Sequence, residues 1–470
     1  MNAKSNRFMG DERMKRYGAR RMATSAMTVL LAAALAACGG SSGAGTDEAP
    51  AEPAPKKSNE PVTLKVATWV PKENEGFQAI PKAFTKKFPN VTVEWIFVQN
   101  GPGGVYNALT ESIAANDPID VFWHNNFPDT VTKDFAEDLT PWTSKDPEFK
   151  KYPFLPGHLE TFQWKGKQYA LSRGNDVFVV FYNKDLLAKY GLEAPKDNWT
   201  WEDLKAMAKK ATNPAEKHYG ISNHSSWFQF GATVLPYVNG HADNINMLNA
   251  DMTKSVADQP KVLDDLAWMQ DWIKKDGIML NPRRSKEAGV AEAQGSTWTN
   301  GQSLFHLHVS PSIAGFKTSL KFAWDVAPMP AGSKTQASLA FNNPMFVSKA
   351  SKHKEEAWEF VKFWAATAEG QKLLIDAGGT FPNTNDPDIV NHFKTNKLYE
   401  GLNTAALVYS SGKAKIDPTI VGLGGTLNAG LFVPWATVKG FAEEESPYDY
   451  FPPKVEKLNK DLQELAAKFK

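Results

Sequence analysis

Residues 62–97 read VTLKVATWVPKENEGFQAIPKAFTKKFPNVTVEWIF, and this stretch indicates how the body of the protein is built. Apolar and polar residues alternate from Val62 to Val66 and again from Val91 to Phe97, which is the period of a half-buried strand. Between these runs, Phe77 to Phe88 has the composition of a helix that ends before Pro89. A strand, a helix and a second strand in succession predict an α/β fold.

The same alternation continues along the rest of the chain. Ile119–Trp123 and Val177–Phe181 are short apolar runs typical of buried strands. Apolar residues recur at helical spacing from Val262 to Ile273, from Ala357 to Trp364 and from Val455 to Phe469. Strands that alternate with helices over more than 400 of the 470 residues predict α/β architecture in two domains.

Length and composition limit the classes of function. A chain of 470 residues with 42% hydrophobic content can bury more than one core. The 53 Lys and Arg residues balance 52 Asp and Glu residues, whereas a nucleic-acid binder needs a clear basic excess. We therefore expect no nucleic-acid partner. Fifteen tryptophans supply aromatic faces of the kind on which sugars stack.

Residues 1–37 have the pattern of a secretory signal peptide. Basic residues precede the apolar stretch Ala23–Ala37, which is too short to cross a bilayer stably. Met14 is an alternative start to Met1, because the first 13 residues add little to such a signal. Residues 1–37 hold seven basic and two acidic side chains, so the chain from Cys38 onward has 46 basic and 50 acidic residues, a net charge of −4.

The single cysteine, Cys38, lies at the end of this signal, and it excludes an intramolecular disulfide. Leu35-Ala36-Ala37-Cys38-Gly39 resembles a bacterial lipobox, which implies cleavage before Cys38 and acylation of its thiol and amino group. Such double attachment holds a protein firmly at a membrane. A chance signal peptide followed by a free cysteine is the alternative. Residues 38–61, rich in Gly, Ser, Pro and charge, then form a flexible tether.

Seven short segments resemble those of bacterial extracellular solute-binding proteins of the maltose-binding-protein-like group. In chain order they are Ala83–Val93, Trp164–Ala170, Val180–Leu186, Trp199–Leu204, Thr299–Ser303, Val326–Pro330 and Lys354–Phe363. Each segment alone is weak, but the ordered set is specific, and the resemblance covers roughly residues 62–468. The resemblance implies the two-domain periplasmic-binding-protein (Venus flytrap) fold, with crossover hinge strands and a ligand held in the cleft.

The resemblance also implies a division of the chain into lobes. The first lobe is expected to comprise residues 62–172 and about 312–345, and the second residues 173–311 and about 346–470. The crossovers are expected at Tyr169–Asp176 and near Ala340–Pro344, where a few residues would absorb the rotation that closes the lobes.

A sugar site needs aromatic planes for the C–H faces of the rings and polar groups for the hydroxyls. The resemblance places a stacking ring at Trp435, with Lys439 one helical turn later. It also places a second aromatic wall at Trp227 and Phe228. Each of these aromatic residues could instead belong to the core.

The remaining candidates lie after strands and in the crossovers. They are Trp69, Glu73 and Asn74; His124, Asn125 and Asn126; Arg173, Asn175 and Asp176; and His308, Ser310 and Asn343. Loops at the carboxyl ends of α/β strands are where ligands bind. The alternatives are a solvated loop at Glu73, an Asn-rich turn after His124, and a structural ion pair between Arg173 and Asp176.

His306 and His308 alternate on one expected strand and so share a face, a spacing that zinc can use. No carboxylate or third histidine lies nearby in the sequence, so we expect neither a metal nor a cofactor.

Two classes of function follow from these features. The first is a lipid-anchored receptor that captures a mono- or oligosaccharide and delivers it to the permease subunits of an ABC importer. The second is a secreted carbohydrate-active enzyme with paired carboxylates, but the chain from Val62 onward has no G-x-S-x-G elbow, no H-E-x-x-H and no cysteine nucleophile. The same receptor could also bind a polyamine, a peptide or an organic acid. We expect a non-catalytic monomer, anchored to the membrane at the cell surface or in the periplasm.

Overall fold

A computed structural model describes residues 60–99, 103–378, 380–416, 431–435, 437, 441 and 445–469. Met1–Ala51 separates from a compact body, Glu52–Lys470, to which everything below refers. The expected signal peptide, Cys38 and most of the tether lie outside the described residues.

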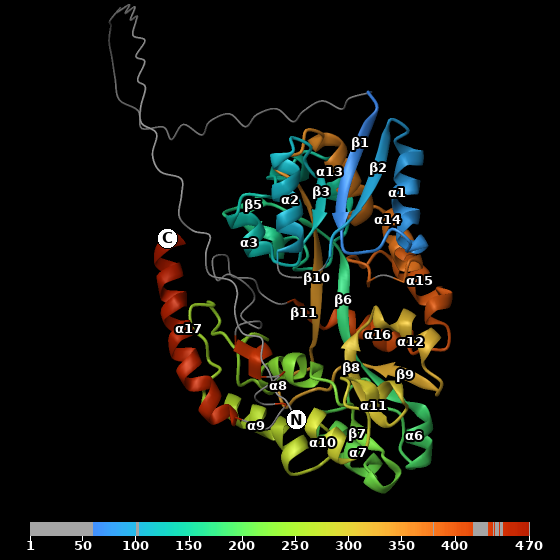
Figure 1. Cartoon of the computed structure of the whole chain (residues 1–470), viewed down its shortest axis with the longest axis vertical. Helices are drawn as coiled ribbons and strands as arrows, with labels where there is room; N and C mark the ends of the chain where they lie inside the picture. The colour runs from blue at the N-terminus through green and yellow to red at the C-terminus, as the bar shows by residue number, and fades with distance from the viewer. Residues whose placement is uncertain are drawn as a thin grey trace, which may run out of the picture. The chain divides into compact units, whose positions relative to one another are not determined.

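Nine of the described strands form one sheet, whose main path runs β2-β1-β3-β10-β6-β8-β7 (Figure 1). Strand β11 pairs with β10, and β9 pairs with β6. The bounds are β1 Val62–Thr68, β2 Val91–Phe97, β3 Val121–Trp123, β6 Leu171–Asn183, β7 Tyr219–Ile221, β8 Ser303–Val309, β9 Trp324–Ala327, β10 Ser338–Val347 and β11 Ala414–Ile416. A small separate hairpin pairs β4 (Gln163–Trp164) with β5 (Lys167–Gln168).

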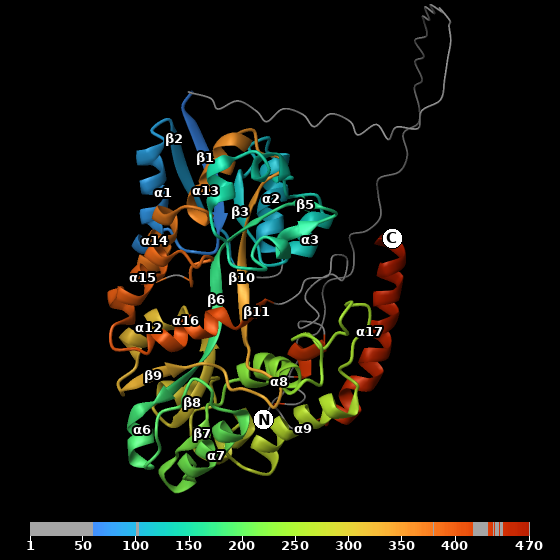
Figure 2. The same ribbon diagram turned by 180° about the vertical axis from the view of Figure 1, so that it is seen from behind.

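Helices flank this sheet, as two opposite views show (Figures 1 and 2). Their bounds are α1 Glu75–Lys87, α2 Gly104–Ala114, α3 Phe127–Thr132, α4 Thr140–Thr143, α5 Pro147–Lys151, α6 Lys184–Lys189, α7 Trp201–Ala211, α8 Ala232–Asn239, α9 Pro260–Lys274, α10 Pro282–Glu287, α11 Ser296–Thr299, α12 Ser312–Ser319, α13 Lys354–Ala365, α14 Ala368–Asp376, α15 Pro387–Thr395, α16 Thr404–Gly412 and α17 Pro447–Phe469. Within the described ranges, no helix combines the length and the apolar character needed to cross a membrane.

The opening segment folds as its pattern predicts, into β1, α1 and β2. The side chain of Asn74 caps α1 by accepting a hydrogen bond from the backbone N–H of Phe77 at 3.3 Å. The apolar face of α1, which includes Ile80 and Phe84, is buried. β1 and β2 pair in parallel, with Val62 opposite Val91. The sequence expectation of an α/β fold is confirmed.

Two long antiparallel strands, β6 and β10, connect the two halves of the sheet. The first half of β6 pairs with β10, from Leu171 opposite Met345 to Val177 opposite Ala340. Its second half pairs with β8 and β9. The far end of β10 pairs with β3. The crossover strands expected from the sequence are therefore present, and a bulge interrupts their register between Asn342 and Pro344.

The C-terminal segments pack differently from the expected division into lobes. Helix α13, expected in the second lobe, contributes Trp358 and Trp364 to the apolar cluster around β1 and β3. Conversely, Ile313 of α12, a helix expected in the first lobe, packs with Val177 and Val179 of β6. The reason is the direction of β10, which carries the chain back to β3 before α13 begins.

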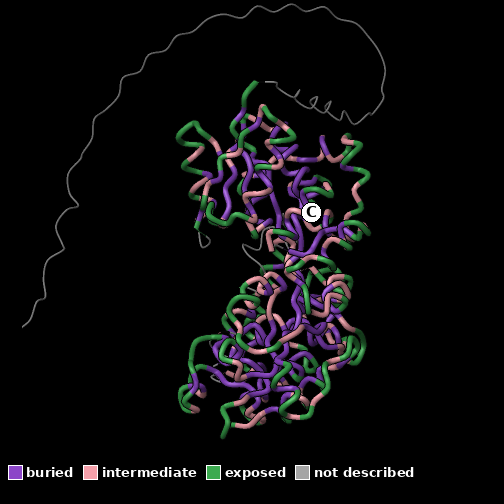
Figure 3. Tube along the Cα trace, turned by 90° about the vertical axis from the view of Figure 1, so that its right-hand side faces the viewer, coloured by how far each residue is buried: buried purple, intermediate pink, exposed green. Residues whose placement is uncertain are grey.

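Buried residues run through both halves of the body, as the trace coloured by exposure shows (Figure 3). One apolar cluster surrounds β1 and β3, and the largest surrounds β6, β8 and the helices α7, α8 and α9. Each half therefore has its own core, and β6 and β10 run between them.

Candidate functional site

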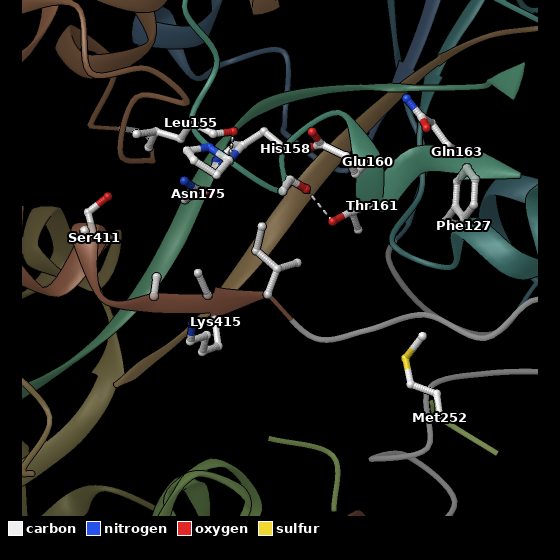
Figure 4. Close-up of a pocket in the computed structure, with 16 residues that line it drawn as sticks. Phe127, Leu155, His158, Glu160, Thr161, Gln163, Asn175, Met252, Ser411 and Lys415 are labelled. Carbon is white, nitrogen blue, oxygen red and sulfur yellow. Dashed lines mark hydrogen bonds between the residues drawn. The ribbon is translucent and has the colours of Figure 1, made fainter. Parts of the chain in front are cut away.

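A cavity of about 690 Å³ lies beside the crossover strands (Figure 4). Its volume falls within the range typical of small-molecule sites. Segments far apart in the sequence contribute to its wall, including α3, the loop before β4, β6, β10, α16 and β11. The residues are Phe127, Leu155, Pro156, Gly157, His158, Glu160, Thr161, Gln163, Asn175, Met252, Ala340, Ser411, Gly412, Ala414, Lys415 and Ile416.

Backbone and side-chain hydrogen bonds fix the loop that supplies the largest continuous part of this wall, Leu155 to Gln163. The Leu155 N–H donates to the Asn383 carbonyl at 2.9 Å. The Thr161 hydroxyl donates to the Gly157 carbonyl at 2.5 Å, and Gln168 donates from Nε2 to the Leu159 carbonyl at 3.0 Å. These hydrogen bonds hold the loop in one conformation, so its polar groups have defined positions in the cavity wall.

His158 and Asn175 lie next to each other at the inner end of the cavity (Figure 4). His158 Nδ1 contacts the Leu155 carbonyl oxygen at 3.1 Å. Burial lowers the pKa of His158, and neighbouring polar groups, Asn175 among them, partly offset that effect. The imidazole is therefore neutral at physiological pH, and because Nδ1 donates to the Leu155 carbonyl, Nε2 is left as an acceptor.

Exposed charged and polar side chains also line the cavity. Glu160, Gln163 and Lys415 are exposed, and they offer a carboxylate, an amide and an ammonium group. Leu155, Ile416 and other apolar residues also line the cavity. A wall that combines a few polar groups with apolar patches can bind a polyhydroxylated ring.

The crossover contains a pair of opposite charges, Arg173 and Asp176, next to the cavity. The Arg173 guanidinium lies 4.4 Å from the centre of the Trp123 ring. Burial lowers the pKa of Arg173 to about 10, and the Asp176 carboxylate opposes the shift. Burial likewise raises the pKa of Asp176, which Arg173 and a hydrogen bond from Asn343 oppose. Asn343 is itself buried and donates from Nδ2 to the Gly174 carbonyl at 3.4 Å.

Several buried polar atoms around these residues have no hydrogen-bond partner among the described residues. They are Arg173 Nε and Nη1, Asn175 Oδ1, Asp176 Oδ1, Ser310 Oγ, Asn342 Nδ2 and Thr380 Oγ1. A buried polar group without a partner costs about 1–3 kcal/mol. The crossover therefore holds donors and acceptors that a ligand or ordered water would satisfy.

The loops after β1 and β3 use their polar residues mainly locally. Asn126 caps α3 by accepting from the Asp129 N–H at 3.1 Å, as Asn74 caps α1. His124 accepts a hydrogen bond from the Asn126 N–H at 3.2 Å, and burial lowers its pKa. Glu73 and Asn125 are exposed, whereas Trp69 is half-buried with its edge against Trp123 at 5.7 Å.

The three aromatic candidates of the second half lie in the largest apolar cluster. Trp227, Phe228 and Trp435 each have 0% of their surface exposed. Trp227 donates from Nε1 to the Ser222 hydroxyl at 3.3 Å, and Trp435 packs against Phe228 at 5.7 Å. Their burial matches the alternative given by the sequence, in which these aromatic residues belong to the core. Lys439 lies outside the described residues.

His306 and His308 share a face of β8, as expected, with ring centres 5.4 Å apart. A third histidine, His224, lies 5.3 Å from His306 and 5.4 Å from His308. It comes from a distant loop, which is why no spacing in the sequence indicated it. In the part of the chain that the structure describes, no group of three or more His, Cys, Asp or Glu residues is arranged to hold a metal ion.

Of the residues expected from the sequence to bind ligand, Asn175 lines the cavity. Arg173, Ser310 and Asn343 are buried, and Asp176 is half-buried, in or beside the crossover strands. Sequence reasoning missed His158, Glu160, Gln163, Met252 and Lys415. No motif marks them, because they come together only when β6, β10 and β11 align.

Two halves with their own cores, joined by antiparallel crossover strands with a cavity beside them, define a hinged solute-binding protein. The family model described as bacterial extracellular solute-binding protein matches residues 70–372. The chain belongs to this family, whose location is extracytoplasmic.

Curated relatives agree with this assignment. The chain is 25% identical over 320 residues to an arabinooligosaccharide-binding protein of Bacillus subtilis, covering 64% of this chain and 68% of the relative. It is 23% identical over 341 residues to a maltotriose-binding protein of Pyrococcus abyssi, covering 70% and 69%. It is 26% identical over 310 residues to a putative binding protein of Brucella abortus, covering 64% and 71%.

Solved structures share the fold. An ABC substrate-binding protein from Listeria monocytogenes, in complex with cycloalternan, superposes with a TM-score of 0.71 at 22% identity, covering 87% of this chain and 100% of that chain. The GacH receptor of Streptomyces glaucescens superposes with a TM-score of 0.68 at 20% identity, covering 86% and 98%.

Proposed function

We propose that this protein is a lipid-anchored, extracytoplasmic receptor that captures a mono- or oligosaccharide and delivers it to an ABC importer. The cavity beside the crossover strands carries this proposal, because its wall combines neutral, charged and apolar groups from both halves of the sheet. Ligand bound against β6 and β10 would favour the closed arrangement of the two halves that a permease can recognise.

The balance of charge in the cavity favours a neutral polyhydroxylated cargo. Among the described residues of its wall, Glu160 is the one carboxylate, whereas a polyamine would need several. Lys415 is the one ammonium group in that described lining, whereas a di- or tricarboxylate would need more cationic groups. Asn175, Gln163 and the neutral His158 supply hydrogen bonds without net charge.

The receptor has no catalytic step in this proposal. Its matched relatives are binding proteins, and a hydrolase would need two carboxylates placed on either side of a scissile bond. Turnover of any bound sugar would overturn the receptor assignment.

A thermal-shift screen tests the cargo. Maltotriose, an arabino-oligosaccharide, mannobiose, amino acids, polyamines and organic acids are added one at a time to the purified protein. A ligand that binds the folded state raises the melting temperature. A response to sugars alone is expected. A response to a polyamine, amino acid or organic acid with none to any sugar would overturn the cargo assignment.

The anchor is tested separately at Cys38. The variant Cys38→Ser removes the thiol that the lipobox pattern marks for acylation. The wild-type protein is expected in the membrane fraction of the host, and Cys38→Ser in the soluble extracytoplasmic fraction or as unprocessed precursor. Membrane-bound, fully processed Cys38→Ser would refute the lipid anchor.

A further inference from the structure

Met252 combines two properties that are uncommon together. It is a large apolar residue with 41% of its surface exposed, and its backbone φ is 58°, in the left-handed region. That region is disfavoured for residues with a branched or bulky side chain and favours glycine, asparagine and aspartate. Asn249 and Asp251, whose residue types tolerate this region, lie within three residues of Met252. The positive φ nevertheless belongs to the methionine.

Hydrogen bonds hold the loop in this conformation. The Met252 N–H donates to the Asn249 carbonyl at 2.9 Å. Asn249 Oδ1 accepts from the backbone N–H groups of Thr253 at 2.9 Å and Lys254 at 2.8 Å. The Ser255 N–H donates to Asn459 Oδ1 on α17 at 2.7 Å, which ties the loop to that helix. The loop is therefore anchored at its base while Met252 projects at its tip.

Met252 also lines the cavity beside the crossover strands (Figure 4). The large apolar residues exposed by more than a third in the described part of the chain are Phe97, Ile113, Met252 and Tyr448. Of these, Met252 is the one in the cavity wall. Strained backbone that persists at a ligand site is a recognised mark of function.

We propose that Met252 is a ligand-binding residue that covers the apolar C–H face of a sugar ring in this cavity. The inference rests on the proposed function. A thioether is polarizable and flexible, so it can follow the uneven surface of a ring. Sugar binding would bury the exposed part of the side chain, and the polar wall at His158, Gln163 and Asn175 would bind the hydroxyls.

Oxidation of methionine gives a direct readout of this contact. Dilute hydrogen peroxide transfers one oxygen atom to the thioether and gives methionine sulfoxide and water, and the reaction is fastest at exposed side chains. Peptide mass spectrometry then compares Met252 with Met247 and Met279, which are fully buried. Saturating maltotriose, or the panel sugar that stabilises the protein most, is expected to slow oxidation of Met252 several-fold.

Two variants separate binding from folding. Met252→Gly removes the apolar contact and relieves the positive φ, so the unliganded protein should melt at the same temperature or higher. Its affinity for the same sugar, measured by titration calorimetry, should fall about five- to tenfold, the equivalent of losing part of one buried side chain. Met252→Ala should show the same loss of affinity. Ile113→Ala, an exposed position outside the cavity, is the matched control and should bind as the wild type does.

The outcomes distinguish this inference from the proposed function. Sugar binding by the wild type, with no protection of Met252 and unchanged affinity in Met252→Gly and Met252→Ala, would refute the role of Met252 and leave the receptor assignment intact. If no sugar binds the wild type, the proposed function fails, and the inference fails with it.

Discussion

Acidification should destabilise this protein through the cluster formed by His224, His306 and His308. His224 accepts a hydrogen bond at Nδ1 from the Ser226 N–H, and His306 contacts the Ser222 hydroxyl at 2.9 Å through Nδ1. His308 lies beside both rings. Burial, together with the neighbouring His308, lowers the pKa of His224 to about 4. Burial, with His224 and His308, lowers the pKa of His306 well below its ordinary value.

The size of the effect follows from linkage. A basic group whose pKa is depressed in the folded state contributes stability above its unfolded pKa and loses it as pH falls toward the folded pKa. At about pH 5 an unfolded histidine, with a pKa of about 6.5, is almost fully protonated, whereas His224 in the fold stays mostly neutral. The difference is about 2 kcal/mol for His224, and His306, whose pKa is lowered in the same direction, adds to it. Acidification from about pH 7.5 to about pH 5 should therefore remove at least about 2 kcal/mol from the free energy of unfolding.

Urea unfolding at these two pH values measures the change in free energy. The single variant His224→Gln should lose about 2 kcal/mol less than the wild type on acidification, and the double variant His224→Gln/His306→Gln should lose less still. Trp298→Phe alters the packing of the same cluster without removing a titrating group, because Trp298 lies 5.4 Å from His306. It should lower stability equally at both pH values. A double variant with the same pH dependence as the wild type would refute the reasoning.

Three further substitutions test particular contacts, each by urea unfolding. Gly174→Ala should be strongly destabilising, because its Cβ would lie 1.9 Å from Thr380 Oγ1 and 2.7 Å from the Phe381 carbonyl oxygen; wild-type stability would contradict that crowding. Lys362→Met should cost about 3–5 kcal/mol, since it leaves the half-buried Asp146 carboxylate, now 2.7 Å from Nζ, without its partner; a neutral result would mean that water replaces the lysine. Trp435→Ala should cost about 3–5 kcal/mol as a core truncation, whereas a small cost with weaker sugar binding would restore its role as a stacking residue.

Helices and strands were predictable where the spacing of apolar residues within one segment indicates them. β1, α1 and β2 match the alternation and helical spacing of residues 62–97, because apolar periodicity reflects the backbone geometry of the segment itself. The crossover strands at β6 and β10 were also expected. The lobe to which α13 belongs was not, because it depends on the direction in which β10 returns the chain.

The site was predictable only in part. Asn175 lies in the cavity wall, and Arg173 and Asp176 lie next to it in the crossover. The role of Trp435, Trp227 and Phe228 could not be read from their positions, since an aromatic residue at helical spacing fits a core and a ligand wall equally well. The described structure buries all three.

By itself, the sequence determined the fold class and the family, since each depends on residues close together or on an ordered set of segments. Only the tertiary structure brought His158, Met252 and Lys415 to one cavity and His224 to His306 and His308. These residues are distant in the chain, and no local periodicity constrains which distant segments meet. Their proximity is set by how β6, β10 and β11 align, a long-range pairing that only the folded chain makes.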